Sequence, residues 1–293
     1  GPMMQVAVHE SLSTSERARV VAFLDSSRRR DESGLDDHLA ADLAHGPAGG
    51  FRAAIATVDQ QVVGYAQASA ANDGMVIGLV APGATETEQA ELIRAVLAAL
   101  PPEAAVTWWT NTDSHTLATT LGLQPARSLL EMTCALPIPD TTQVEVRPFR
   151  VGSDEAAWLE VNNAAFSWHG EQGGWDLATL TQREHEPWFD PTGFLLHERA
   201  GRLAAFCWTK LHHRSTLVGE IYVIAVHPDF HGLGLGRALT VAGLQHLHGA
   251  GATQAMLYVD AHNTTAVGLY RALGLQVGRI QQSYLRPPQG DTP

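Results

Sequence analysis

The same order of predicted elements occurs twice in this chain, and that repetition constrains the fold most strongly. In the first half, strand-like runs at 51–58, 62–70 and 75–80 precede a helix at 86–100, a strand at 106–110, a helix at 114–121 and a strand at 128–134. The second half repeats this order at 194–199, 203–211, 219–226, 234–248, 256–259, 263–273 and 278–285. We therefore expect an α/β (α+β) protein with two domains, each a mixed, mainly antiparallel sheet flanked by helices.

Short sequence matches support duplication of an ancestral domain. Leu121-Gly122-Leu123-Gln124 recurs as Leu273-Gly274-Leu275-Gln276, although matches between apolar sequences also arise by chance. The proline-flanked segment 137–142 has the composition of a linker. We place the domains at 4–136 and 143–287.

Composition excludes several classes of partner. The formal net charge is −12, which disfavours a large basic surface for nucleic acid or anionic lipid. The chain has no apolar run of about 18 residues, so we expect no membrane span. Cys134 and Cys207 lie in apolar strand-like runs, where a buried free thiol is favoured over a disulfide. These features predict a cytoplasmic protein, which we also expect to be a monomer.

A glycine-rich loop carries the strongest chemical signal. Gly232, Gly234 and Gly236 follow an apolar strand and open an apolar-periodic helix. Such glycines let backbone N–H groups approach an anion, and a helix N-terminus favours phosphate. A tight structural turn or a dinucleotide site would look similar, but the loop occurs late in the sheet pattern, which disfavours a dinucleotide fold.

This loop resembles the phosphate loop of the GNAT acetyltransferase superfamily, except that His231 replaces the usual Gln or Arg. The segment Asn263 to Leu275 resembles a second superfamily motif, with Leu275 in place of Phe. The resemblance implies acetyl-CoA as cosubstrate and Tyr270 as a general acid, although core packing of Tyr270 is the alternative. The positions implied in binding acetyl-CoA are Ile224, Ala225, Val226, His231, Gly232, Leu233, Gly234, Leu235, Gly236, Arg237, Asn263, Thr264, Thr265, Ala266, Val267 and Gly268.

Residues 145–285 resemble the mycothiol synthases, the tandem GNAT enzymes of actinobacteria. The matching segments include 161–166, 169–175, 188–191, 208–210 and 219–223, with Gly170 where that family commonly has Pro. The resemblance implies N-acetylation of desacetylmycothiol, a cysteine amide-linked to glucosaminyl-inositol. It assigns Glu220 as the general base and as a substrate contact. The other implied substrate contacts are Asp37, Glu171, Lys210 and Tyr258.

Simpler roles compete with these assignments. Glu220 could be a surface carboxylate on an edge strand, Lys210 a strand lysine with its ammonium in water, and Glu171 a loop charge. Asp37, or its neighbour Asp36, is assigned on an ambiguous local alignment. The histidines, including His212-His213, are expected to be solvated, and no spacing predicts a metal site.

The first half lacks the corresponding chemistry. Glu86 and Glu88 occupy the positions of Gly232 and Gly234, which would place carboxylates in a phosphate cradle. We expect a degenerate N-terminal domain and a catalytic C-terminal one. The alternatives are a GNAT enzyme for another small amine or peptide N-terminus, and a non-catalytic acetyl-CoA-binding protein.

Overall fold

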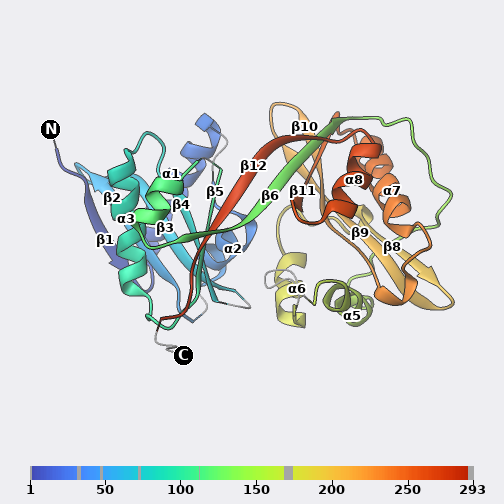
Figure 1. Cartoon of the computed structure of the whole chain (residues 1–293), viewed down its shortest axis with the longest axis horizontal. Coiled ribbons are helices and arrows are strands. Elements are labelled where there is room, and N and C mark those ends of the chain that lie inside the picture. Colours follow the sequence, from blue (N-terminus) through green and yellow to red (C-terminus); the bar gives the residue numbers. More distant parts are fainter. Residues whose placement is uncertain are drawn as a thin grey trace. The chain divides into compact units, whose positions relative to one another are not determined.

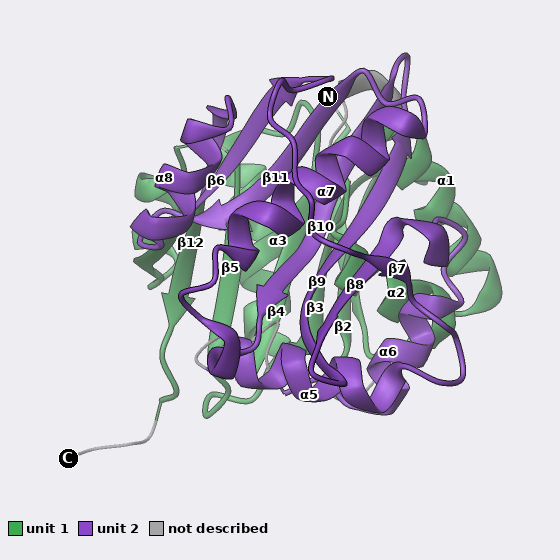
Figure 2. Ribbon diagram, turned by 90° about the vertical axis from the view of Figure 1, so that its right-hand side faces the viewer, with its two compact units in different colours: residues 1–127, 282–293 green, residues 128–281 purple. Residues whose placement is uncertain are grey.

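The computed structural model describes residues 2–31, 34–46, 49–71, 74–111, 113–167 and 174–289. It divides into two compact units (Figures 1 and 2), unit 1 with residues 1–127 and 282–293, and unit 2 with residues 128–281. The predicted order of strands and helices is confirmed in both halves. The segments that precede each repeat, for which the sequence pattern gave no prediction, add further helices and one edge strand to each unit.

The elements are as follows. Unit 1 contains β1 (Gln5–His9), α1 (Thr14–Asp31), α2 (Asp37–His45), β2 (Arg52–Val58), β3 (Gln61–Ala71), β4 (Gly74–Val80), α3 (Glu86–Ala99), β5 (Val106–Thr110) and α4 (His115–Thr120). Unit 2 contains β7 (Arg147–Pro148), α5 (Glu155–Ala165), α6 (Leu177–Glu184), β8 (Phe194–Arg199), β9 (Arg202–His213), β10 (Leu217–Val226), α7 (Leu235–Gly249), β11 (Gln254–Asp260) and α8 (Thr264–Ala272), with 3-10 turns at Pro191–Gly193 and Pro228–Phe230. Two long strands, β6 (Gln124–Ala135) and β12 (Gln276–Arg286), have residues in both units.

In each unit, the strand that pairs antiparallel with β5 or with β11 comes from the other half of the chain. In unit 1, β4 runs parallel to β5, and β5 pairs antiparallel with residues 282–286 of β12. In unit 2, β10 runs parallel to β11, and β11 pairs antiparallel with residues 129–135 of β6. The predicted domains, 4–136 and 143–287, are each one continuous stretch of chain. The compact units differ from them, because residues 282–293 belong to unit 1 and residues 128–136 belong to unit 2. Apolar alternation predicts a strand but does not identify its partner.

Helices cover both faces of the sheet in unit 2 (Figure 1). On one face, α7 and α8 pack on alternate strand residues such as Cys207 and Leu257. On the other face, α5 and α6 enclose an aromatic cluster that includes Trp158 and Trp208, both with 0% exposure. Their ring centroids are 5.5 Å apart in an edge arrangement. Burial of each large aromatic side chain stabilises the fold by about 1.5–3 kcal/mol.

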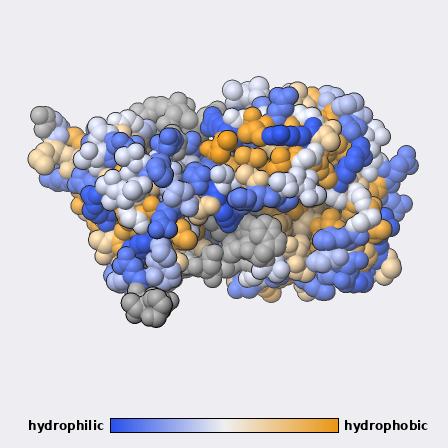
Figure 3. Space-filling model, viewed as in Figure 1, coloured by the Kyte–Doolittle hydropathy of each residue, from blue (hydrophilic) through white to orange (hydrophobic). Residues whose placement is uncertain are grey.

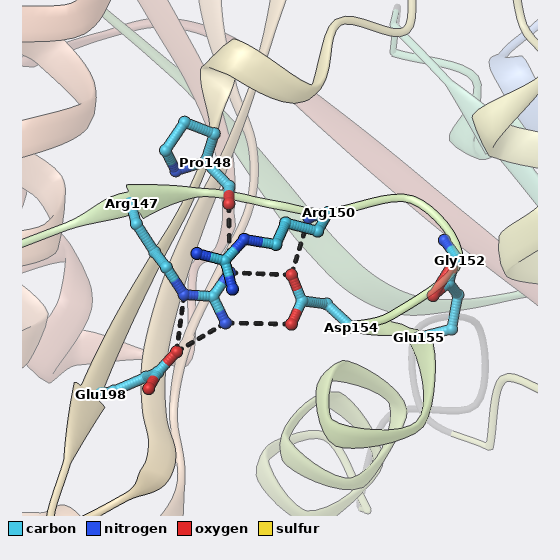
Figure 4. Close-up of polar contacts among 7 residues, drawn as sticks. All are labelled: Arg147, Pro148, Arg150, Gly152, Asp154, Glu155 and Glu198. Carbon is cyan, nitrogen blue, oxygen red and sulfur yellow. Dashed lines mark hydrogen bonds and ion pairs between the residues drawn. The ribbon is translucent and has the colours of Figure 1, made fainter.

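An arginine-centred cluster fixes the start of α5 against the edge of the sheet (Figure 4). Arg147 of β7 donates two hydrogen bonds to Asp154, at 2.8 and 2.9 Å, and a third to Glu198 of β8, at 2.6 Å. The Arg150 backbone N–H also donates to Asp154, at 2.6 Å. The hydrogen bonds from Arg147 hold the pKa of Asp154 below its ordinary value. The two-pronged geometry fixes orientation as well as distance.

The surface mixes polar and apolar residues (Figure 3), with apolar area over the β6, β11 and β12 part of unit 2. Large apolar side chains that are exposed in unit 2 include Leu233 at 52%, Tyr258 at 40% and Ile280 at 55%. Within the described ranges, no helix combines the length and the apolar character that crossing a bilayer requires.

Two carboxyl groups meet where α5 begins and α6 ends. Burial, together with the neighbouring Glu155, raises the pKa of Glu184 from 4.5 to about 7. Glu155 also accepts a hydrogen bond from the Gly152 backbone N–H. Because the folded-state pKa of Glu184 is raised, its carboxyl group favours folding while protonated. That contribution is present below about pH 4.5 and is lost as the pH rises through 7.

We predict that Glu184→Gln raises the melting temperature at pH 8 and changes it little at pH 5. The amide can donate to Glu155 at any pH and carries no charge. Glu160→Gln, on the exposed side of α5, is the matched control and should leave the melting temperature unchanged at both values. Equal effects of Glu184→Gln at pH 5 and pH 8 would contradict the assigned pKa.

Candidate active site

The parallel pairing of β10 and β11 stops partway along both strands. The ladder joins Val218–Ile221 to Gln254–Leu257. The remaining residues of the two strands, 222–226 and 258–260, are all described and form no ladder with one another. Backbone N–H and C=O groups on this side of β10 are therefore available to a ligand.

A β-bulge marks the point of separation. In the pairing of β10 with β9, Ile221 faces Thr209 and Val223 faces Trp208, so Tyr222 is the additional residue. A bulge bends its strand, increases the local twist and redirects side chains. Tyr222 contacts the aromatic cluster next to its neighbour Val223. The strand consequently changes direction where its ladder with β11 ends.

The loop before α7 has the geometry of an anion cradle. Gly232 and Gly234 have φ values of 83° and 72°, in the left-handed region that favours glycine. A Cβ added at either position would meet nothing within 4 Å. Gly234 is the N-cap of α7 and has no side chain with which to satisfy the first-turn N–H groups. These donors and the helix dipole favour a phosphate group at this end.

The other positions predicted to bind acetyl-CoA lie in the same loop and at the start of α8. Residues 231–234 and Arg237 are exposed, and the Arg237 guanidinium donates to Asp140 at 2.9 Å. Asn263 is the N-cap of α8 and accepts from the Ala266 backbone N–H at 3.3 Å. Thr264, Thr265 and Gly268 are exposed, while Ala266 and Val267 are partly buried. A side-chain role for His231 in binding phosphate stays a prediction.

Glu220 lies in the interior of the sheet, so its interpretation as an edge-strand surface residue is wrong. Its strand, β10, is paired on both sides, and its side chain is 9% exposed. His212 of β9 reaches this carboxylate, with 2.7 Å between Nε2 and Oε1. The expectation that His212 is simply solvated is wrong as well. Because side chains alternate between the two faces along a strand, the sequence could have placed His212 on the same face as Lys210. Its approach to Glu220 depends on the register of β9 with β10, which the sequence does not reveal.

Lys210 and Tyr258 lie in the same part of unit 2. Lys210 faces Glu220 in the strand register and is 8% exposed. Its Nζ is 4.5 Å from the centroid of the Trp188 ring, a cation–π contact that sequence analysis missed. Burial, and secondly the charge of Glu220, raises the pKa of Tyr258. The structure thus brings together three predicted substrate contacts, Glu220, Lys210 and Tyr258.

Tyr270 is 8% exposed on α8 and packs among the residues between the sheet and α7. Burial, and secondly the nearby Cys207 thiol, raises its pKa to about 12. The hydroxyl therefore keeps its proton at neutral pH. Packing in the core is thus part of the role of Tyr270.

Two other substrate contacts were predicted, Asp37 and Glu171. Asp37 is the first residue of α2 in unit 1, next to the N-cap Asp36, whose side chain accepts from the Leu39 backbone N–H. Glu171 lies outside the described residues. Their participation stays a prediction.

Unit 1 differs from unit 2 at the equivalent helix end. Thr85 caps α3 by accepting from the Glu88 backbone N–H, while the Glu88 carboxylate accepts from the Thr85 N–H. Counted from the two N-caps, Thr85 corresponds to Gly234, so the prediction that Glu86 and Glu88 occupy the positions of Gly232 and Gly234 is wrong. Both carboxylates belong to the first turn of α3, where the capping box also satisfies the Glu88 backbone N–H. This geometry disfavours a bound phosphate at α3.

The position of α7 depends on its close approach to β9. A Cβ at Gly243 would lie 2.5 Å from the Cys207 Sγ, which is fully buried. We predict that Gly243→Ala destabilises unit 2 by about 1–3 kcal/mol, although alanine favours a helix over glycine. The readout is the melting temperature.

Gly249→Ala is the control, because a Cβ at the last residue of α7 would meet nothing within 4 Å. Combining Gly243→Ala with Cys207→Ala should recover part of the loss. A stable Gly243→Ala protein would show that α7 does not pack this closely.

Comparisons with known proteins agree with this geometry. The acetyltransferase (GNAT) family profile matches residues 158–275. A mycothiol acetyltransferase of Thermomonospora curvata is 38% identical over 294 residues, covering 95% of this chain and 96% of the relative. Another, of Thermobispora bispora, is 48% identical over 179 residues, covering 58% of this chain and 61% of the relative. A solved tandem GNAT protein from the clavulanic acid biosynthesis pathway has the same fold, with TM-score 0.66, 13% identity and 99% and 100% coverage.

Proposed function

The chain belongs to the mycothiol acetyltransferase family of N-acetyltransferases, and on that basis we propose that unit 2 acetylates the cysteinyl amine of desacetylmycothiol. One observation supports this most directly. A buried carboxylate, Glu220, lies on β10 two residues before the segment that leaves the ladder with β11. The amine acceptor and the acetyl donor would meet there.

Acetyl-CoA would supply the acetyl group as a thioester. The cradle at residues 232–236 fits its pyrophosphate, because the space beside Gly232 and Gly234 is open and no side chain caps the first turn of α7. The backbone of Ile224, Ala225 and Val226, free of β11, would hold the extended pantetheine arm. A backbone N–H near Ile224 would donate to the carbonyl oxygen as negative charge develops on it.

Glu220 would accept the proton that the attacking amine releases. An α-amine has a reference pKa of about 7.7–8.0, so a modest base is sufficient to expose its lone pair. The polar part of the acceptor would bind Lys210, Tyr258 and, in the segment outside the described residues, Glu171. Asp37 of unit 1 would be a further contact.

Tyr270 would donate its hydroxyl proton to the departing sulfur. The raised pKa, about 12, ensures that this proton is present throughout the neutral range. In the same proposal unit 1 is structural, because the capping box at Thr85 and Glu88 takes the place of a phosphate site. The cytoplasmic location and the monomeric state stay predictions.

The acceptor is tested by offering several amines with acetyl-CoA and measuring CoA release. Desacetylmycothiol should give the highest kcat/KM, ahead of polyamines, aminoglycosides and peptide N-termini. A higher kcat/KM for one of these other amines would reassign the substrate. Binding of acetyl-CoA without turnover on any amine would instead indicate a non-catalytic protein.

We predict that Gly234→Glu abolishes the productive binding of acetyl-CoA, measured by calorimetry, and abolishes turnover as well. The substitution strains a residue at φ 72° and places a carboxylate in the cradle. Gly83→Glu in the equivalent turn of unit 1, at φ 75°, is the matched control and should retain both. The assignment of the cradle fails if Gly83→Glu is the variant that loses binding.

We predict that Glu220→Gln lowers turnover most strongly below neutral pH. There the acceptor amine is largely protonated and needs the base, whereas above about pH 8 it is partly neutral on its own. The measurement is the pH profile of kcat for both proteins. A ratio of kcat values that does not change between pH 6 and pH 9 would show that Glu220 is structural.

We predict that Tyr270→Phe keeps acetyl-CoA affinity and slows the chemical step by about 10²-fold, the lower end for general-acid assistance, because a thiolate leaves readily. The phenylalanine ring keeps the packing of Tyr270 among the residues between the sheet and α7. Single-turnover rates are compared with melting temperatures. A destabilised variant with a wild-type rate per folded molecule would remove Tyr270 from the mechanism.

A further inference from the structure

His212 and Glu220 form a close pair across two adjacent strands. His212 faces Val218 in the register of β9 with β10, and Glu220 faces Lys210, so both side chains project from the same face. The Nε2 to Oε1 distance is 2.7 Å. The His212 side chain is 22% exposed and that of Glu220 is 9% exposed. The pair therefore joins a buried carboxylate to a more accessible imidazole.

Other charged groups surround this pair. The Lys210 ammonium lies over the rings of Trp188 and Tyr222, at 4.5 and 5.7 Å from their centroids. Tyr258 is close enough for Glu220 to raise the pKa of its hydroxyl. Glu131 raises the pKa of Tyr258 as well, whereas Arg214 and Arg279 lower it. The His212 imidazole makes a short hydrogen bond to Glu220 Oε1, at 2.7 Å.

A general base must present a specific oxygen to its proton donor. A glutamate side chain has several rotatable bonds, and a bond that fixes one carboxylate oxygen also fixes the direction of the other. With Oε1 held by the imidazole, Oε2 would be the oxygen turned toward the acceptor amine. A short hydrogen bond to a carboxylate is also stronger than one between neutral groups.

We propose that His212 is a positioning residue that holds Glu220 Oε1 through its Nε2–H and so directs Oε2 toward the substrate amine. This inference rests on the proposed role of Glu220 as base. His212 itself exchanges no proton with the substrate and acts only through the carboxylate. An amide N–H at the same place fulfils the same function, whereas an apolar side chain does not.

The test compares His212→Gln and His212→Leu, with His213→Leu as the matched control on the exposed neighbour. Misplacing a catalytic group costs up to about 10²-fold, so His212→Leu should lower kcat by about 10- to 100-fold and leave the KM for acetyl-CoA unchanged. His212→Gln should retain kcat to within about threefold, because it keeps the donor. His213→Leu should match the wild type.

A double-mutant cycle separates positioning from a general structural effect. In the Glu220→Gln background, His212→Leu should cause no further loss of kcat, because the group that it orients is already inactive. Independent, multiplying losses would overturn the proposal, and so would a wild-type kcat for His212→Leu. If His212→Leu folds poorly, His212→Ala takes its place, and added imidazole should then restore turnover; no restoration counts against the proposal.

The cycle also distinguishes two failures. A wild-type kcat for Glu220→Gln would refute the assigned base and the whole proposed mechanism. A slow Glu220→Gln enzyme beside a fully active His212→Leu enzyme would refute the positioning role alone.

Discussion

The candidate site depends on a ladder of backbone hydrogen bonds that ends early. Strands β10 and β11 pair over four residues of each strand and then separate, at the bulge on Tyr222. The backbone groups released there need partners, and a bound molecule with an extended amide-containing arm would provide them. The buried carboxylate of Glu220 and the helix end at Gly234 lie before and after this segment of the chain. In the proposed function these three features serve one site because β10 leaves its neighbour.

The two units show that the same order of elements does not by itself create a binding site. Both place a helix after the third strand of the repeat, as α3 and as α7. In unit 1 the Glu88 backbone N–H donates to the Thr85 side chain within a capping box, whereas in unit 2 the cap is a glycine. A few side chains therefore decide whether a helix end stabilises itself or receives an anion.

The sequence was sufficient to predict the order of strands and helices, because apolar periodicity and turn residues are local signals. It also singled out Gly232 and Gly234, and the structure shows that both have a left-handed backbone. Pairing could not be predicted in the same way. The exchange of the ends of β6 and β12 and the approach of His212 to Glu220 depend on register, which joins residues distant in sequence. The raised pKa of Glu184 likewise comes from a meeting of α5 and α6 that no motif records.

The central claim is that the acetyl group goes to an amine held beside Glu220. It is tested most directly by incubating the protein with acetyl-CoA and desacetylmycothiol and weighing the product by mass spectrometry, before and after treatment with hydroxylamine. The account predicts one added acetyl group that survives the treatment, as an amide does. An acetyl group that hydroxylamine removes would place it on sulfur, and that result, or the absence of any acetylated product, would contradict the account.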